Sequence, residues 1–180
     1  MILNSSASQH KVVQDVWKAL DGLTDPEIPV ITLREMGIIR DVEFIAEDSV
    51  VVVITPTYSG CPAMEQIHDD VRNTLKAMGL QVEVRTQLAP AWTTDWMTDI
   101  AKDKLKAYGI APPNRQCGAP SQQISVVHFL RKPSSTEQAV ECPRCGSSHT
   151  FESSKFGSTA CKALYKCLDC QEPFDYFKPY

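Results

Sequence analysis

Cys142-Pro143-Arg144-Cys145 and Cys167-Leu168-Asp169-Cys170 are the two stretches that decide the fold of the C-terminal part of the chain. In each stretch two thiols lie three positions apart, so both sulfurs can bind one metal ion, and two such pairs complete a tetrahedron. A segment this short buries too little apolar surface to fold well alone, whereas a structural metal supplies on the order of 10 kcal/mol or more. We therefore expect residues 139–180 to form a metal-binding ribbon.

The identity of the metal is open between two candidates. A site of four cysteines is typical of structural zinc, which we expect here, but it also suits a single redox-active iron. The ribbon carries five basic and five acidic residues, a balance that argues against a nucleic-acid-binding ribbon. His149 is expected at the surface, because four thiolates already fill the coordination shell.

The composition limits the classes of function open to the chain. Hydrophobic residues make up 43%, enough for a core, and the formal net charge is −4. A negative charge argues against general binding to nucleic acid, because contact with phosphates needs cationic residues. The start lacks the features of a signal peptide, and no apolar run approaches the roughly 20 residues of a membrane-spanning helix. We expect a soluble, cytoplasmic protein without a membrane partner.

Hydrophobic periodicity predicts an α+β domain over residues 1–110. The expected helices cover 12–20 (with Ser8 as its cap), 61–78 and 93–108, and the expected strands cover 38–45, 50–55 and 82–88. This order favours a small sheet with helices packed on one face. Residues 111–138 are expected to be a linker with an extra strand at 124–130, making few contacts between the domain and the ribbon.

Seven cysteines in a cytoplasmic protein favour metal binding or thiol chemistry over disulfides. Cys61 precedes Pro62, and proline is favoured as the first helical residue, so Cys61 is expected at or near a helix N-cap. Backbone N–H groups and the helix dipole would lower the pKa of its thiol there, making it the most reactive cysteine at neutral pH. The alternative is a buried cysteine that only packs.

Four further residues have roles that local sequence leaves open. Asp25 and Glu27 either cap a turn or face Cys61 as metal-binding or proton-handling carboxylates. Cys117 lies in the linker and is expected to be incidental. Cys161 lies inside the ribbon but has no Cys-x-x-Cys partner.

Longer motifs carry a resemblance to known families. Asp25-Pro26-Glu27-Ile28-Pro29-Val30 and Thr55-Pro56-Thr57-Tyr58-Ser59-Gly60-Cys61-Pro62 resemble the SufT-like iron–sulfur assembly domain. Three more stretches make the chain similar to the D subunits of bacterial phenylacetyl-CoA epoxidase systems. These are Pro90-Ala91-Trp92-Thr93-Thr94-Asp95-Trp96, Phe156-Gly157-Ser158-Thr159-Ala160-Cys161-Lys162-Ala163-Leu164-Tyr165 and Glu172-Pro173-Phe174-Asp175-Tyr176-Phe177-Lys178.

The resemblance implies an accessory subunit in aerobic phenylacetate catabolism rather than an enzyme in its own right. It implies help in maturing the iron–sulfur centre of the reductase subunit or the iron centre of the di-iron oxygenase. Cys61 would be the working thiolate, holding iron or an iron–sulfur cluster transiently, with Asp25 and Glu27 beside it and the ribbon as a docking module. Two alternatives remain: an electron carrier with iron in the four-cysteine site, and a non-catalytic scaffold. The chain has neither a dinucleotide-binding fingerprint nor ferredoxin cysteine spacing.

Overall fold

The computed structural model describes residues 5–113 and 139–180. Three α-helices, one short 3₁₀ helix and seven strands lie in these ranges. In chain order they are α1 (Ser5–Leu20), β1 (Ile39–Ala46), β2 (Ser49–Ile54), α2 (Met64–Lys76), β3 (Gln81–Thr86), η1 (Thr94–Trp96), α3 (Asp99–Tyr108), β4 (Ile110–Ala111), β5 (Thr150–Ser154), β6 (Lys162–Cys167) and β7 (Pro173–Phe177). The strand expected at 124–130 and Cys117 lie outside the described residues.

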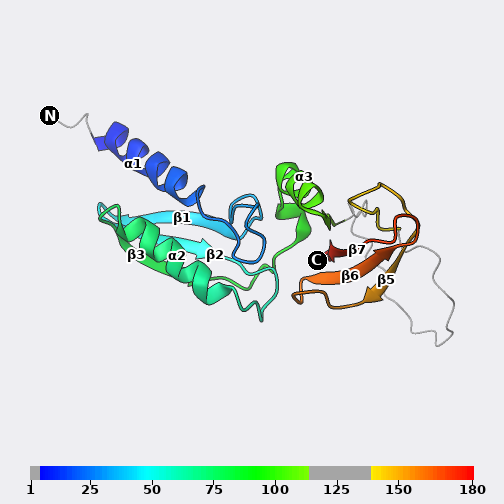
Figure 1. Ribbon diagram of the computed structural model, residues 1–180. Coiled ribbons are helices and arrows are strands. Elements are labelled where there is room, and N and C mark those ends of the chain that lie inside the picture. The colour runs from blue at the N-terminus through cyan, green and yellow to red at the C-terminus, as the bar shows by residue number, and fades with distance from the viewer. Residues whose placement is uncertain (1–4, 114–138) are drawn as a thin grey trace, which may run out of the picture.

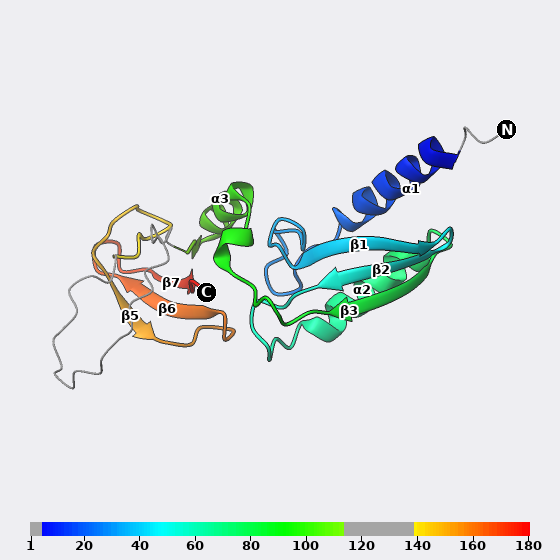
Figure 2. The ribbon, with the colours of Figure 1, turned by 180° about the vertical axis from the view of Figure 1, so that it is seen from behind.

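The first sheet has the order β1-β2-β3. A short turn joins β1 to β2 as an antiparallel pair, whereas β2 and β3 are parallel and therefore need the crossover helix α2. Figure 1 shows α2 lying across one face of this sheet, and Figure 2 shows the opposite face without a helix on it. The central strand β2 is rich in valine, and five of its six residues are buried.

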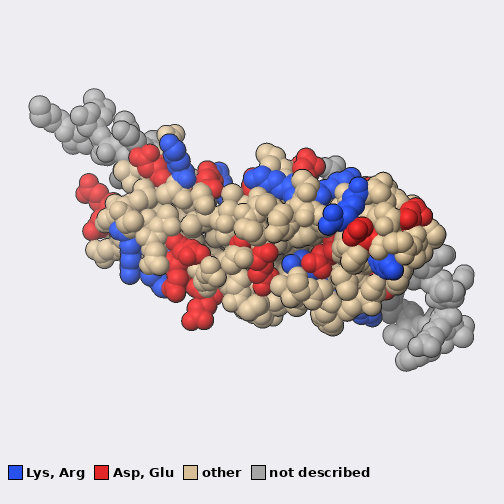
Figure 3. All heavy atoms as spheres, in the orientation of Figure 1, with Lys and Arg blue, Asp and Glu red and all other residues tan. Residues whose placement is uncertain are grey.

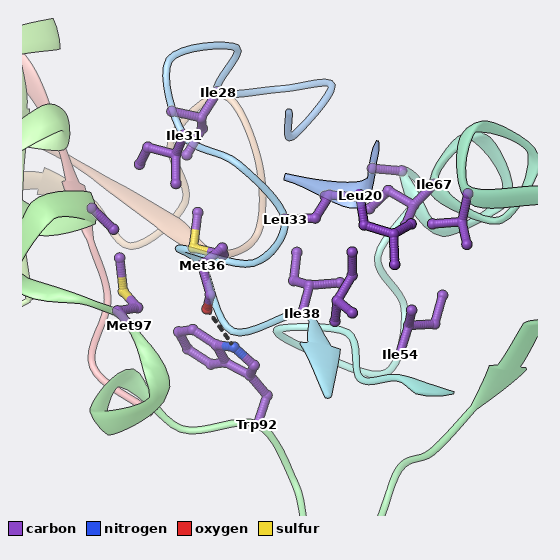
Figure 4. Packing of buried hydrophobic residues seen from close by; sticks show 14 of the residues in the cluster. Leu20, Ile28, Ile31, Leu33, Met36, Ile38, Ile54, Ile67, Trp92 and Met97 are labelled. Carbon is purple, nitrogen blue, oxygen red and sulfur yellow. Dashed lines mark hydrogen bonds between the residues drawn. The ribbon is translucent and has the colours of Figure 1, made fainter. Parts of the chain in front are cut away.

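The main hydrophobic core lies between this sheet, α1, α2 and the loop that follows α1. Helix α2 contributes one buried stripe, Ile67, Val71 and Leu75, at the spacing of a single helical face. Figure 4 shows that side chains of the loop after α1, such as Ile31 and Met36, share this core with Trp92, which follows β3 in the chain. The core thus extends past the sheet toward the ribbon.

The second sheet has the order β4-β7-β6-β5, and its first strand comes from outside the ribbon. Ile110–Ala111 pairs in parallel with β7, and Phe177 and Cys161 belong to the same hydrophobic cluster as the helices of the N-terminal domain. The expectation of few contacts across the boundary is therefore wrong. The reason is that the chain returns at β7 to pack against its own N-terminal domain. The domain limits at residues 110 and 138 remain a prediction.

The predicted fold class is confirmed, with differences at two helices. Ser8 lies inside α1, which begins at Ser5, so it is not the cap. The helix expected over 93–108 is divided into η1 and α3, because Thr98 is extended and its hydroxyl accepts the N–H of Ala101 at 3.1 Å as a new N-cap. Figure 1 shows α3 between the two sheets rather than on the first one.

Among the described helices, none is long and apolar enough to cross a membrane. On the face drawn in Figure 3, basic and acidic side chains are intermixed over both parts of the molecule.

Candidate functional site

The four ribbon cysteines form a closed group. Their sulfur atoms all lie within 4.8 Å of one another, with Cys142 and Cys170 at 3.7 Å and Cys145 and Cys167 at 3.6 Å. A tetrahedral zinc site with Zn–S distances of about 2.3 Å requires sulfurs ~3.8 Å apart. The donor set and its spacing therefore fit a tetrahedral metal ion held by four thiolates.

The two knuckles share one backbone device. The residue after the second cysteine of each knuckle has a positive φ, 75° at Gly146 and 64° at Gln171. This left-handed residue turns the chain back, so that the N–H of Gly146 reaches the carbonyl of Cys142 at 2.9 Å. In the second knuckle the N–H of Cys170 points at the sulfur of Cys167, 3.5 Å away. Hydrogen bonds to the sulfur lower the pKa of the Cys167 thiol to about 7, and the largest contribution comes from the backbone N–H of Cys170.

Polar side chains tie the knuckles together outside the sulfurs. Asp169 accepts a hydrogen bond from the hydroxyl of Ser147 and lies 3.1 Å from Nδ1 of His149. The Ser147 hydroxyl and the His149 side chain together lower the pKa of the Asp169 carboxyl. His149 is exposed and belongs to this outer link, as its expected place at the surface requires.

Cys61 lies in the loop between β2 and α2. Its N–H donates to the carbonyl of Tyr58 at 3.2 Å, and its own carbonyl accepts the N–H of Met64. The N-cap of α2 is Ala63, so Cys61 lies near the cap, two residues before it, rather than at the cap itself. The thiol is only partly exposed and packs against the main core.

Asp25 and Glu27 lie in the loop after α1. Figure 1 shows this loop and the loop between β2 and α2 at the same end of the first sheet, the end that faces the ribbon. Asp25 is buried, and its Oδ1 accepts the N–H groups of Glu27 and Ile28 at 2.8 and 2.9 Å. It therefore caps a turn, which was one of its two expected roles. It is also close enough to Cys61 for its charge to add to the effect of burial in raising the pKa of that thiol. A metal-binding or proton-handling role for Asp25 stays a prediction.

Asp25, Glu27 and the thiol of Cys61 make up a second candidate site, and each of these acidic groups has a raised pKa. Burial is the largest cause for Asp25 and for Glu27, and the charge of Asp25 raises the pKa of Glu27 further. Burial raises the pKa of Cys61 to about 11, and the charges of Glu27 and Asp25 add to the effect. The N–H of Ala63 opposes this shift without reversing it. The expectation of a lowered pKa at Cys61 is therefore wrong, because desolvation and neighbouring carboxylates outweigh the helix start.

The ribbon adds three residues to the same place, and local sequence reading did not assign them. Cys161 is buried against the N-terminal core, and the charge of Lys162 partly opposes the raised pKa values of Asp25 and Glu27. The hydroxyl of Thr159 lies 2.9 Å from the sulfur of Cys161, and its influence on Glu27 partly opposes the raised pKa of that carboxyl. The sequence signal that could have pointed to them is Cys161, the fifth cysteine of the ribbon, which has no Cys-x-x-Cys partner. Its position relative to Cys61 depends on tertiary structure and cannot be found from local sequence.

Aromatic side chains fix the ribbon beside the N-terminal domain. Trp92 is 3% exposed and donates its indole N–H to the carbonyl of Met36 at 3.0 Å, as Figure 4 shows. Its ring meets those of Phe177 and Tyr180 edge-on, with centroids 6.0 and 6.2 Å apart. These three rings form part of the joint between the ribbon and the N-terminal domain.

Comparison with known families divides the chain as the two sheets do. Residues 13–86 match the family described as iron–sulfur cluster assembly protein, and residues 128–178 match the PaaD zinc beta ribbon domain. A crystal structure of a domain of unknown function, DUF59, from Bacillus anthracis is 27% identical and has a TM-score of 0.51. It covers 56% of this chain and 97% of its own. The class is thus an iron–sulfur assembly domain joined to a four-cysteine ribbon.

Named relatives narrow the class. The chain is 46% identical over 168 residues to the D subunit of the putative 1,2-phenylacetyl-CoA epoxidase of Escherichia coli (strain K12), covering 92% of each. It is 33% identical over 94 residues to an "Fe-S protein maturation auxiliary factor" of Porphyromonas gingivalis, covering 51% of this chain and 89% of that protein. The chain belongs to the family of phenylacetyl-CoA epoxidase D subunits.

Proposed function

We propose that this protein is an accessory subunit of a phenylacetyl-CoA 1,2-epoxidase system in aerobic phenylacetate catabolism. It assists the maturation of an iron–sulfur or iron centre in another subunit, the reductase or the oxygenase, and does not itself epoxidise the ring. The name of the Escherichia coli relative supports the system, and the maturation factors similar to residues of the N-terminal half support the task.

The observation that carries this proposal is the group formed by Cys61, Asp25 and Glu27. These three acidic groups come from two loops at one end of the first sheet, Asp25 is buried while Cys61 and Glu27 are partly exposed, and each has a raised pKa. Negative charge at one group therefore disfavours it at the others, and a bound cation relieves that repulsion. An iron ion is a cation that accepts both thiolate and carboxylate ligands.

Cys61 would bind iron by exchanging its proton for the metal. With a pKa of about 11 the thiol is protonated at neutral pH, so it does not act as a free thiolate. Metal binding releases protons from thiol ligands, and the affinity of such a site is correspondingly lower at neutral pH than that of preformed thiolates. A moderate affinity suits iron that is cargo, to be passed on to another subunit.

The ribbon would have a structural task, with zinc as its ion. Cys142, Cys145, Cys167 and Cys170 fill a tetrahedral shell, which leaves no open position for substrate or for cargo. The ion would supply the folding energy that so small a sheet lacks. The ribbon then holds β7 and the Thr159–Lys162 turn against the N-terminal domain.

The test is maturation of the whole system. The other subunits are expressed with wild-type protein, with no protein, and with Cys61→Ala or Cys61→Ser, and iron is measured in each purified subunit. We expect one subunit to lose most of its iron without this protein and with either variant, because a hydroxyl is not a soft iron ligand. Cys117→Ala is the matched control and should behave as wild type. Normal iron with Cys61→Ala would refute the proposal.

A further inference from the structure

We propose that a second copy of this chain binds along the outer edge of β3, so that the three-stranded sheets of both copies join into one continuous sheet. The two β3 strands pair antiparallel, and Val84 of one copy lies opposite Val84 of the other. This surface is separate from the Cys61 loop and from the ribbon. The proposal goes beyond the proposed function and does not depend on it.

The first argument is the direction of the backbone groups of β3. The strand lies at one edge of the sheet, as Figure 2 shows. The N–H groups of Gln81 and Gln87 donate to carbonyls of the segment 48–54, at 2.7 and 2.8 Å. Because backbone groups point to alternate sides along a strand, those of the residues between them at even positions point outward, away from β2. The outward N–H and C=O groups belong to Val82, Val84 and Thr86.

The second argument is that the two edges of the sheet differ. At the other edge, β1 has register shifts at two places, and the side chain of Asp41 accepts the N–H of Val42 at 2.8 Å. Irregularities of this kind keep an edge strand from pairing with another chain. By contrast, β3 pairs with β2 without a register shift and contains neither proline nor lysine. Its edge has none of these devices against a further strand.

The third argument is the placement of the charges of β3. Val82 and Val84 pack against the main core, on the side of α2. Glu83 and Arg85 alternate with them, so they lie on the opposite side of the sheet, and both side chains are more than half exposed. Within one chain they form an ion pair at 2.9 Å. An ion pair this exposed is weak, so both charges remain open to a partner strand.

The charge pattern selects one register for the second copy. With Val84 at the two-fold axis, Glu83 of each copy lies opposite Arg85 of the other, and opposite charges across two strands stabilise the pairing. In the same register Val82 lies opposite Thr86, so the outward backbone groups meet as hydrogen-bonded pairs. Moving the axis by one residue places Glu83 opposite Glu83, or Arg85 opposite Arg85, which is destabilising. A two-fold axis also closes the assembly at two copies.

The test is sedimentation velocity of full-length, zinc-loaded protein from about 1 μM to about 1 mM, because so small an interface is expected to be transient. We expect the wild type to become dimeric toward the upper end. Glu83→Arg and Arg85→Glu each place like charges opposite one another, and each should raise the dissociation constant about tenfold. An equimolar mixture of the two variants restores opposite charges and should dimerise at least as tightly as the wild type.

Controls establish which surface and which register are used. Glu43 is an exposed acid on the same side of the sheet but on β1, so Glu43→Arg should leave the dissociation constant unchanged. Zinc content and circular dichroism establish that each variant is folded. Hydrogen exchange reports the register, because the amides of Val82, Val84 and Thr86 should exchange more slowly as the protein concentration rises. The amides of Glu83 and Arg85 already point toward β2 and should not change.

Several outcomes would overturn the proposal. One is a protein that stays monomeric at the highest concentration, and another is a dimer that survives both single charge reversals. A mixture of the two variants that fails to dimerise would also overturn it. The same holds if the Val84 amide is protected only when another subunit of the epoxidase system is added, since the edge would then bind a different partner. The proposed function is tested separately, by iron in the other subunits, and stands or falls independently.

Discussion

The two thiol sites of this molecule differ in how completely the protein assembles them. The four ribbon sulfurs all lie within 4.8 Å of one another, and within residues 5–113 and 139–180 no other set of three or more candidate ligands is so close. Cys61 instead lies in the loop between β2 and α2, and the carboxylates that influence its pKa, Glu27 and Asp25, lie in a different loop. The ribbon is built to keep an ion, whereas the second site must draw its ligands together around one.

This difference distinguishes a site that retains its metal ion from a site that exchanges it. Four preassembled thiolates lose little freedom when the ion binds, so their metal contributes its full affinity to folding. At the second site part of the binding energy is spent on removing protons from groups with raised pKa values. An ion held in this way leaves more readily, which is the property that a cargo site requires.

The largest expected effect comes from breaking the closed site. Cys167→Ser removes one of four thiolates, and we expect the ribbon to lose its ion and unfold, since structural zinc supplies on the order of 10 kcal/mol. The loss should also loosen the N-terminal domain near Trp92, because Phe177 packs on that ring. Metal analysis and hydrogen exchange measure both effects.

Cys161→Ser is the matched control for that experiment, because it removes a ribbon thiol that is not part of the closed site. Its zinc content should equal that of wild type. Loss of zinc from Cys161→Ser would show that the two sites are not separate.

The joint between the sites is the next target. Trp92→Ala removes a ring that is 3% exposed and that contacts two aromatic residues of the C-terminal segment. We expect a loss of about 3–5 kcal/mol in the free energy of unfolding. Denaturant titration measures it. Phe151→Ala, at an aromatic residue that is 45% exposed on β5, should change stability by no more than about 0.5 kcal/mol.

The comparison also explains what could be predicted from the sequence. The ribbon ligands follow from spacing alone, because two cysteines three positions apart must converge on one side of a tight knuckle. The strands of the first sheet follow from runs of β-branched residues. The packing of Cys161 in the N-terminal core could not be found in this way, since it depends on the return of β7 to the N-terminal domain. The pKa of Cys61 could not either, because burial and loop carboxylates decide it.

A smaller effect distinguishes the two roles of Asp25. In Asp25→Ala the N–H groups of Glu27 and Ile28 lose their acceptor, and we expect a loss of about 1–3 kcal/mol. Asp25→Asn keeps an oxygen acceptor for both and should cost much less, while removing the charge beside Cys61. Thermal unfolding of the two variants gives the difference. Equal destabilisation would mean that the turn depends on charge rather than on its hydrogen bonds.

The smallest effect on stability, and the sharpest test of the second site, is the pH dependence of alkylation at Cys61. A thiol with a pKa of about 11 has roughly one molecule in ten thousand ionised at pH 7, compared with a few per cent for an unperturbed cysteine of pKa about 8.5. The thiolate is the reacting species, so the rate at Cys61 in protein without iron should rise about tenfold for each pH unit between 7 and 10. Glu27→Gln should accelerate the reaction at pH 7, because it removes a charge that raises this pKa. Mass spectrometry of labelled peptides follows Cys61 and the linker residue Cys117 in the same sample. If Cys61 reacts ahead of Cys117 at pH 7, the Cys61 thiol is already ionised at that pH. The second site would then hold a preformed thiolate, as the ribbon does, and its pKa would not be raised.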